Sequence, residues 1–425
     1  MTSLPNSPTD FPPVRACLAA VLLLGLAAGA ARAEAGPPDQ PWFPRAPRLP
    51  DPAGRVVHVE TVAELQEAVA RAEPETTILI ADGHYRLPRY LEITADGVTL
   101  RSRSGNRDAV ILDGQASRHI ELIGIRNASG VTIADLTVQN VVANGIKLNN
   151  DTPVHQVTIR NCVIRNVWQR GVKSVRSPRL KTRGGVIEYC LFYNDRPKRF
   201  TDDPHDRPDN FDGNYVGAID LMDAVDWTIR DNVFVGIQGR TRTGRGAIFV
   251  WFESQGCRIE RNLIIDCDQG IALGNAHRPA GTPFHAADFL VRNNFIVRAP
   301  MNPVFLAYTR GIRLVHNSVH DPDNPRRRGV RVFAENPGLE IENNLLHGFD
   351  IRQERVEGPV RMAGNLADRR LESPFRAADQ GDLRLAPAGE SQLPRVPRLP
   401  DVPRDIDGSP RSDPTFPGAA AGNPG

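Results

Sequence analysis

The stretch that decides the fold runs from Trp227 to Gly274 and reads W-T-I-R-D-N-V-F-V-G-I-Q (227–238), R-G-A-I-F-V-W-F-E-S (245–254) and C-R-I-E-R-N-L-I-I-D-C-D-Q-G-I-A-L-G (257–274). It contains one unit twice: a short alternating strand, an Asn, an apolar pair, a turn, and a Gly that opens a second short strand. Alternation with period two, bounded by Asn and Gly, is typical of β-strands rather than helices.

The same unit recurs along much of the chain. Its Asn appears at Asn232, Asn262, Asn294, Asn317, Asn344 and Asn365. Its Gly appears at Gly145, Gly171, Gly217, Gly246, Gly270 and Gly329. Strand-like repeats of about 20–30 residues indicate a solenoid whose coils bury their core only by stacking. We therefore predict an all-β fold, a single-stranded right-handed parallel β-helix, in which each Asn satisfies backbone groups at a bend.

Length and composition favour one elongated domain. The chain has 425 residues with 40% hydrophobic content, and the repeat assigns residues 56–385 to the β-helix. A Pro-rich linker (34–55) precedes this domain, and a Pro- and Gly-rich tail (386–425), expected to be irregular, follows it. Thr61 and Glu64 have capping-box spacing before a helix that should end near Arg71 and cover the first coil.

Residues 1–33 read as a secretory signal peptide. Arg15 precedes an apolar run (16–30), and a small-x-small cleavage site follows at 31–33. The run is too short to cross a bilayer, although a retained anchor is the alternative. We expect export to the periplasm or the extracellular space. The formal net charge of +2 gives no reason to expect nucleic acid or membrane partners, and we expect a monomer.

Four cysteines follow the predicted signal. Cys162 and Cys190 occupy equivalent positions in neighbouring coils, while Cys257 and Cys267 flank one strand–turn unit. No C-x-x-C pair or nearby His suggests a zinc site. An oxidising compartment permits disulfides, but thiols stacked between coils can pack as small hydrophobic groups, so we predict free buried cysteines.

The longest departure from the repeat lies between Cys190 and Asn232. Its insertion, residues 194–215, reads N-D-R-P-K-R-F-T-D-D-P-H-D-R-P-D-N-F-D-G-N-Y. This segment, called the flap below, is too rich in charge, Pro and Gly to be core. Long loops that carry titratable groups beside a rigid scaffold are where functional residues concentrate. A solvated loop without a function is the alternative.

Alternation along the second strands predicts which side chains face outward. If Ile219 and Ile248 point into the core, the outward set comprises Lys147, Lys173, Asp220, Phe249, Trp251 and Arg331. Just past the strand ends lie Asp223, Glu253, His277, Tyr308 and Arg310. Because neighbouring coils stand ~4.8 Å apart, Lys173 should lie beside Asp220, with Trp251 one coil further on.

This outward surface suits an acidic sugar chain. Aromatic rings stack on pyranose faces, and Lys or Arg side chains pair with carboxylates. The predicted substrate-binding residues are Lys147, Phe249, Trp251, Glu253, His277 and Arg310. The Gly-rich turn 239–246 adds Arg240, Arg242 and Arg245, which could hold uronate or sulfate groups. A mixed-charge surface with incidental aromatics and a solvated basic turn are the alternatives.

The chain also resembles a known group of proteins. The motifs are V-x-V-x-T-x-x-E-L-Q-x-A from Val57, T-I-L-I-A-D-G-x-Y from Thr77, G-V-T-L-R-S from Gly97, and the stacked Asn coils. Over about residues 56–367 they are similar to secreted right-handed parallel β-helix proteins related to polysaccharide lyases and mannuronan C5-epimerases. The resemblance implies a scaffold and an acidic polysaccharide substrate, while one fold hosts many activities.

Within the flap, D-P-H-D at 203–206 resembles a motif of the mannuronan C5-epimerases. The resemblance implies that Asp203 and His205 serve in removing the proton from C5 of a uronate. The base could be His205, Lys173 or Tyr215, and a cation must neutralise the uronate carboxylate. Calcium is a candidate cofactor, held by Asp206 and Asp223.

We predict a polysaccharide lyase that acts by β-elimination, with His205, Lys173, Asp220 and Asp203 as catalytic residues. Three alternatives stay open. Reprotonation from the opposite face would give a C5-epimerase. Asp220 with Asp223 or Glu253 could supply the two carboxylates of a glycoside hydrolase. The chain could also be a glycan-binding solenoid without catalysis.

Overall fold

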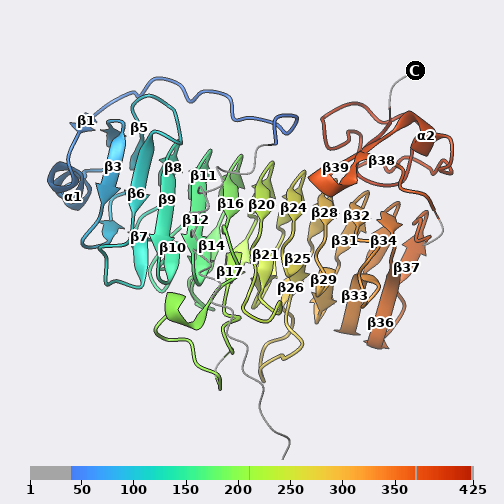
Figure 1. Cartoon of the computed structure of the whole chain (residues 1–425). Helices are drawn as coiled ribbons and strands as arrows, with labels where there is room; N and C mark the ends of the chain where they lie inside the picture. The colour runs from blue at the N-terminus through green and yellow to red at the C-terminus, as the bar shows by residue number, and fades with distance from the viewer. Residues whose placement is uncertain (1–39, 210, 369–370, 423–425) are drawn as a thin grey trace, which may run out of the picture. The chain divides into compact units, whose positions relative to one another are not determined.

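The structure, a computed structural model, describes residues 40–209, 211–368 and 371–422. The predicted signal peptide lies outside these residues. The described residues belong to one compact unit, whose coils stack side by side (Figure 1). Within these ranges, no helix has the length and hydropathy that a membrane-spanning segment requires.

Each coil contributes strands to three long parallel sheets, called A, B and C here, and five coils add a strand to a short sheet D. Sheet A contains β1 (Val56–Val59), β2 (Thr77–Ile80), β5 (Thr99–Ser102), β8 (Thr132–Ala134), β11 (Thr158–Arg160), β15 (Val186–Glu188), β19 (Thr228–Arg230), β23 (Arg258–Glu260), β27 (Leu290–Arg292), β31 (Arg313–Val315), β34 (Glu340–Glu342) and β37 (Arg361–Ala363). Sheet B contains β3 (Gly83–Arg86), β6 (Val110–Asp113), β9 (Thr137–Val141), β12 (Val163–Val167), β16 (Leu191–Tyr193), β20 (Val233–Val235), β24 (Leu263–Ile265), β28 (Phe295–Val297), β32 (Ser318–His320) and β35 (Leu345–His347).

Sheet C is the sheet of the predicted second strands. It contains β4 (Leu91–Ile93), β7 (Glu121–Ile125), β10 (Asn144–Leu148), β13 (Arg170–Ser174), β17 (Gly217–Met222), β21 (Gly246–Trp251), β25 (Gln269–Leu273), β29 (Asn302–Ala307), β33 (Arg328–Glu335) and β36 (Asp350–Glu357). Sheet D contains β14 (Thr182–Arg183), β18 (Ala224–Val225), β22 (Ser254–Gln255), β26 (Ala286–Ala287) and β30 (Thr309–Arg310). The prediction of a right-handed parallel β-helix is confirmed.

The repeated Asn forms a buried ladder at the bend between sheets A and B. The ladder runs through Asn232, Asn262, Asn294, Asn317, Asn344 and Asn365. From Asn262 onward, each Oδ1 accepts the backbone N–H and the Nδ2–H of the preceding Asn at 2.9–3.2 Å. Each Nδ2 also donates to a backbone carbonyl of the preceding coil, as Asn294 does to Ile259 O (2.9 Å). The predicted scaffold role of these residues is confirmed.

The cysteines that follow the predicted signal are free and buried, as expected: Cys162, Cys190, Cys257 and Cys267. Cys162 and Cys190 stack on neighbouring coils, where the backbone N–H of Cys162 donates to Cys190 Sγ at 3.4 Å. Burial raises the pKa of the Cys257 thiol to about 12, so this group stays protonated and packs as a small hydrophobe.

A helix covers the open first coil, as predicted. In α1 (Val62–Ala70), the Thr61 side chain accepts from Glu64 N–H, and the Glu64 carboxylate accepts from Thr61 N–H. Leu65 and Val69 are buried and pack into the core of the β-helix.

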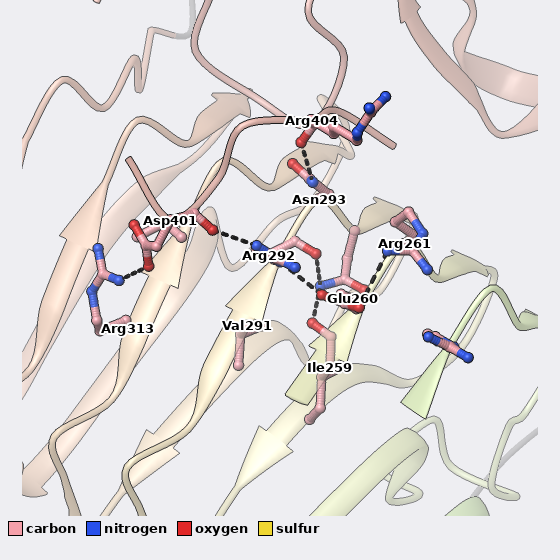
Figure 2. A network of polar contacts seen from close by, with 12 residues as sticks. Ile259, Glu260, Arg261, Val291, Arg292, Asn293, Arg313, Asp401 and Arg404 are labelled. Atoms are coloured by element: carbon pink, nitrogen blue, oxygen red, sulfur yellow. Dashed lines mark hydrogen bonds and ion pairs between the residues drawn. The ribbon is translucent and has the colours of Figure 1, made fainter. Parts of the chain in front are cut away.

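The C-terminal segment packs on the outer face of sheet B. It contains β38 (Phe375–Ala377), η2 (Ala378–Gln380), β39 (Asp382–Leu385) and α2 (Pro387–Glu390), and the described part of the predicted tail is otherwise irregular. Phe375, Leu393 and Phe416 are buried against sheet B. Figure 2 shows the same segment meeting sheet A, where Asp401 pairs with Arg313 and its carbonyl accepts from Arg292.

Candidate active site

Sheet C aligns side chains from distant parts of the chain, as alternation predicted. Lys147, Lys173, Asp220 and Phe249 are register partners on the successive strands β10, β13, β17 and β21. Trp251 lies on β21 opposite Met222 of β17. The column continues through Ala272, Phe305 and Arg331.

The flap, which contains η1 (Phe200–Asp202), contributes one residue to this column. Tyr215 lies at its end, two residues before β17, and its hydroxyl accepts a hydrogen bond from Lys173 Nζ at 2.7 Å. The Arg170 guanidinium stands 3.9 Å from the centroid of the same ring. The flap therefore brings the Tyr215 phenol against two cationic side chains of β13, Lys173 at its hydroxyl and Arg170 over its ring.

Asp220 is the carboxylate at the centre of the column, and both of its oxygens are engaged. Oδ2 accepts from Arg170 Nε at 2.7 Å, and Oδ1 accepts from Trp251 Nε1 at 3.0 Å. Asp220 and Arg170 are both buried, with exposed fractions of 2% and 1%. A buried carboxylate with these partners orients Arg170 and Trp251 rather than serving as a free acid or base.

Arg245 adds a cation that forms no ion pair among the described residues. Its guanidinium lies over the Phe249 ring, 5.0 Å from the centroid. Burial, and next the nearby Arg170, lower the pKa of Arg245. Arg170, Lys173 and Arg245 thus face Asp220 alone, and this excess of positive charge favours an anionic ligand.

Within the flap, two carboxylates form ion pairs that hold the segment in its folded conformation. Lys198 is fully buried and pairs with Asp203 Oδ2 (3.1 Å) and Asp206 Oδ2 (2.8 Å). Its Nζ also donates to the Tyr215 carbonyl at 3.2 Å. His205 is exposed, and its backbone N–H donates to Asp203 Oδ1 at 3.0 Å. The D-P-H-D segment therefore ties the flap together through a buried ammonium.

No metal site is assembled by the residues that the structure describes. They contain no group of three or more His, Cys, Asp or Glu side chains placed to hold an ion. Asp206 is paired with Lys198, whereas Asp223 follows the far end of β17 and accepts from Ser177 N–H at 2.7 Å. The two carboxylates expected as calcium ligands thus do not form one site.

Several predicted substrate-binding residues have partners within the protein. Arg240 pairs with Asp212, and Arg242 pairs with Asp268 at 3.0 Å. Asp268 is buried and also accepts from the backbone of the same turn, so this arginine closes the turn rather than facing the column.

Of the remaining predicted binding residues, Lys147 lies in the column on β10, whereas Glu253, His277 and Arg310 lie past the ends of the sheet C strands. Lys147 pairs with Glu121 at 3.6 Å, and Glu253 pairs with Lys181 at 3.5 Å. The Arg310 guanidinium lies 4.1 Å from the Phe284 centroid. His277 is exposed, and its carbonyl lies 3.1 Å from His285 Nε2.

Arg170 is the residue of the site that alternation misses. It shares its parity with the buried Val172, so a regular strand would turn it inward. Its side chain instead runs outward over Gly217, where an added Cβ would lie 3.6 Å from Arg170 Cδ and 3.3 Å from Arg245 Cβ. A Gly at the register position beside an Arg is the signal that could have identified it.

Residues 121–348 match the family described as a right handed beta helix region, and because this match spans more than half of the chain, the chain belongs to that family. No curated protein matches the sequence.

Among solved structures, the chain is similar to the pectate lyase Pel9A, with 12% identity over 87% of this chain and 97% of that one and a TM-score of 0.42. It is similar to an alginate lyase from Paenibacillus sp. str. FPU-7, with 12% identity over 73% and 98% and a TM-score of 0.38. It is also similar to a mannuronic acid specific family 6 lyase from human gut microbiota, with 11% identity over 73% and 78% and a TM-score of 0.44.

Proposed function

We propose that this chain is an exported polysaccharide lyase that cleaves a uronate-containing polymer by β-elimination on the surface of sheet C. One observation carries the proposal: the 2.7 Å contact of Lys173 Nζ with Tyr215 Oη, near the guanidinium of Arg245, which forms no ion pair among the described residues. The Lys173–Tyr215 pair can exchange protons with the substrate, and the Arg245 guanidinium can bind its carboxylate.

β-Elimination needs these two capacities together. Removing the C5 proton places negative charge on the uronate carboxylate, which Arg245 is free to neutralise. The Lys173–Tyr215 pair must enter this step with one proton removed, as the Tyr215 phenolate held by the Lys173 ammonium. The phenolate oxygen then takes the C5 proton, the C4–O4 bond breaks, and its electrons leave with O4 while C4 and C5 become doubly bonded. Because Lys173 and Tyr215 share a hydrogen bond, either can deliver a proton to O4.

Hydrolysis fits this surface less well. A glycoside hydrolase needs two carboxyl groups about 5–9.5 Å apart. In the described cluster Asp220 is the single carboxylate, and both of its oxygens accept hydrogen bonds from Arg170 and Trp251. Epimerisation uses the same proton abstraction as elimination, so the product distinguishes the two reactions.

The test is turnover of a panel of uronate polymers, followed by the absorbance of the unsaturated product. The wild-type chain should produce it, and Tyr215→Phe should lower kcat by about 100-fold or more because general acid–base catalysis is lost. Tyr189→Phe is the matched control, since Tyr189 lies between β15 and β16, away from sheet C, and should leave kcat unchanged. Full activity of Tyr215→Phe would contradict the proposal.

A further inference from the structure

Phe211, in the flap, holds a large apolar ring in solvent. Its exposed fraction is 51%, and among the large hydrophobic side chains that the structure describes only Ile120 and Met362 are also exposed. A single exposed apolar side chain is ordinary and assigns no function by itself. Phe211 is distinguished by its place in the flap and by its neighbour Tyr215.

The backbone that presents Phe211 is left-handed over three consecutive residues. Phe211, Asp212 and Gly213 have consecutive φ values of 66°, 50° and 74°, a left-handed conformation that a bulky side chain rarely adopts. Two hydrogen bonds hold the turn: Asp212 N–H to Arg207 O at 3.2 Å and Gly213 N–H to Asp206 Oδ1 at 3.1 Å. Left-handed residues recur elsewhere in the chain, for example at Tyr189, Phe252 and Tyr308, so this conformation does not single out Phe211 but only fixes how the turn presents its ring.

The neighbour of Phe211 is the phenol of the proposed active site. The two ring centroids are 4.7 Å apart, with an interplanar angle of 40°. Tyr215 is bound through its hydroxyl to Lys173, whereas Phe211 keeps half of its surface in solvent. A sugar whose C5 reaches Tyr215 Oη therefore has the exposed Phe211 ring beside it.

We propose that Phe211 is a stacking platform that positions a pyranose ring of the polymer against Tyr215. The C–H face of a pyranose is apolar, so stacking would bury the exposed ring and fix the sugar's orientation. Phe211 is thus a positioning residue: it sets substrate affinity and leaves proton transfer to Lys173 and Tyr215. This inference rests on the proposed function, because it assumes that a sugar binds at Tyr215.

The test compares Phe211→Ala, Phe211→Trp and Met362→Ala in the full chain. Met362 is the control because it is also exposed but lies on β37, in the last coil. KM and kcat are measured on a uronate polymer, and the affinity for uronate oligosaccharides is measured in the Tyr215→Phe background, where substrate persists. Phe211→Ala should raise KM and Kd about tenfold with kcat within about twofold. Phe211→Trp should have KM and Kd close to the wild-type values, and Met362→Ala should change neither KM nor Kd.

The outcomes separate this inference from the proposed function. An active wild-type chain whose KM and Kd are unaltered by Phe211→Ala would overturn the platform and leave the lyase standing. A chain that makes no unsaturated product, but binds uronate oligosaccharides more weakly after Phe211→Ala, would support the platform and overturn the lyase. Absence of both binding and turnover would overturn the two together.

Discussion

At the scale of single residues, Asp220 shows how charge organises the site. It is the one carboxylate among three cations, and it holds Arg170 and the Trp251 indole at 2.7 and 3.0 Å. Removing one partner of a buried pair leaves the other charge unpaired, which costs more than the pair itself contributes. Asp220 thus positions the groups that surround Tyr215.

We predict that Asp220→Asn lowers the free energy of unfolding by about 3–5 kcal/mol, because Arg170 is left as a buried, uncompensated charge. The new amide would also present a donor to either Arg170 or Trp251. Urea unfolding measures the change. Asp226→Asn is the control, since Asp226 is exposed and its φ of 56° suits Asn equally well. Equal midpoints for the two variants would show that the buried pair does not have this role.

Residue-level prediction from the sequence succeeded where periodicity governs a position. Lys173, Asp220 and Phe249 follow the alternation of sheet C and lie in register. Arg170 escapes the alternation because Gly217 leaves room for its side chain outside. Lys198, in a segment of high charge, would be expected in solvent, and only the folded flap shows it buried between two carboxylates.

At the scale of elements, the Asn ladder joins the coils at one bend. An interior member satisfies groups on both neighbouring coils, as Asn294 does with Asn262 and Asn317. Asn365 ends the ladder and has one ladder neighbour, Asn344. The ladder therefore offers an interior position and an end position with the same chemistry.

Asn294→Ala should destabilise the protein far more than Asn365→Ala. The interior change removes the acceptor of the Asn262 backbone N–H and one of the two acceptors of its side-chain amide, and it removes the donor to Ile259 O; each buried group left unpaired costs about 1–3 kcal/mol, so we predict a loss of about 3 kcal/mol or more. The half-buried Asn365 can be replaced by water, which limits the loss there to about 1 kcal/mol. Chemical denaturation of both variants tests this, and similar losses would contradict it.

At the scale of the whole molecule, the C-terminal segment is joined to the coils through buried polar groups. His316 Nδ1 lies 3.2 Å from Gly418 O, and Asn343 Nδ2 lies 3.2 Å from His316 Nε2. These partners fit a neutral imidazole with its proton on Nδ1. Burial, and next the nearby Arg411, lower the pKa of His316 to about 3.

This burial predicts a pH dependence of stability. An unfolded His titrates near pH 6.5, so between about pH 6.5 and 3 the unfolded chain binds a proton that the folded chain excludes. The free energy of unfolding must therefore fall as the pH falls through this range, by a few kcal/mol. His316→Asn should show a smaller loss between pH 7 and pH 4 in thermal unfolding. An unchanged pH profile would exclude this contribution.

The fold could be predicted from the sequence because the strand alternation recurs along the chain, with the Asn or the Gly signal repeated in many of the coils. The site could be predicted only in part. The positions of its sheet C residues follow from the repeat. The flap occurs only once in the sequence, so its conformation depends on particular contacts that the repeat does not predict. Tyr215 and Phe211 lie in that segment, so their arrangement follows from the Lys198 ion pairs and the left-handed turn at 211–213.

The central claim is that this surface removes the proton at C5 of a uronate. The most direct measurement is proton NMR of a uronate oligosaccharide incubated with the wild-type chain in deuterated water. We predict that the H5 signal disappears as signals of the unsaturated product appear, and that Tyr215→Phe abolishes both changes. Deuterium at C5 without an unsaturated product would assign the same site to epimerisation. An H5 signal that persists while the oligosaccharide is bound would contradict the claim.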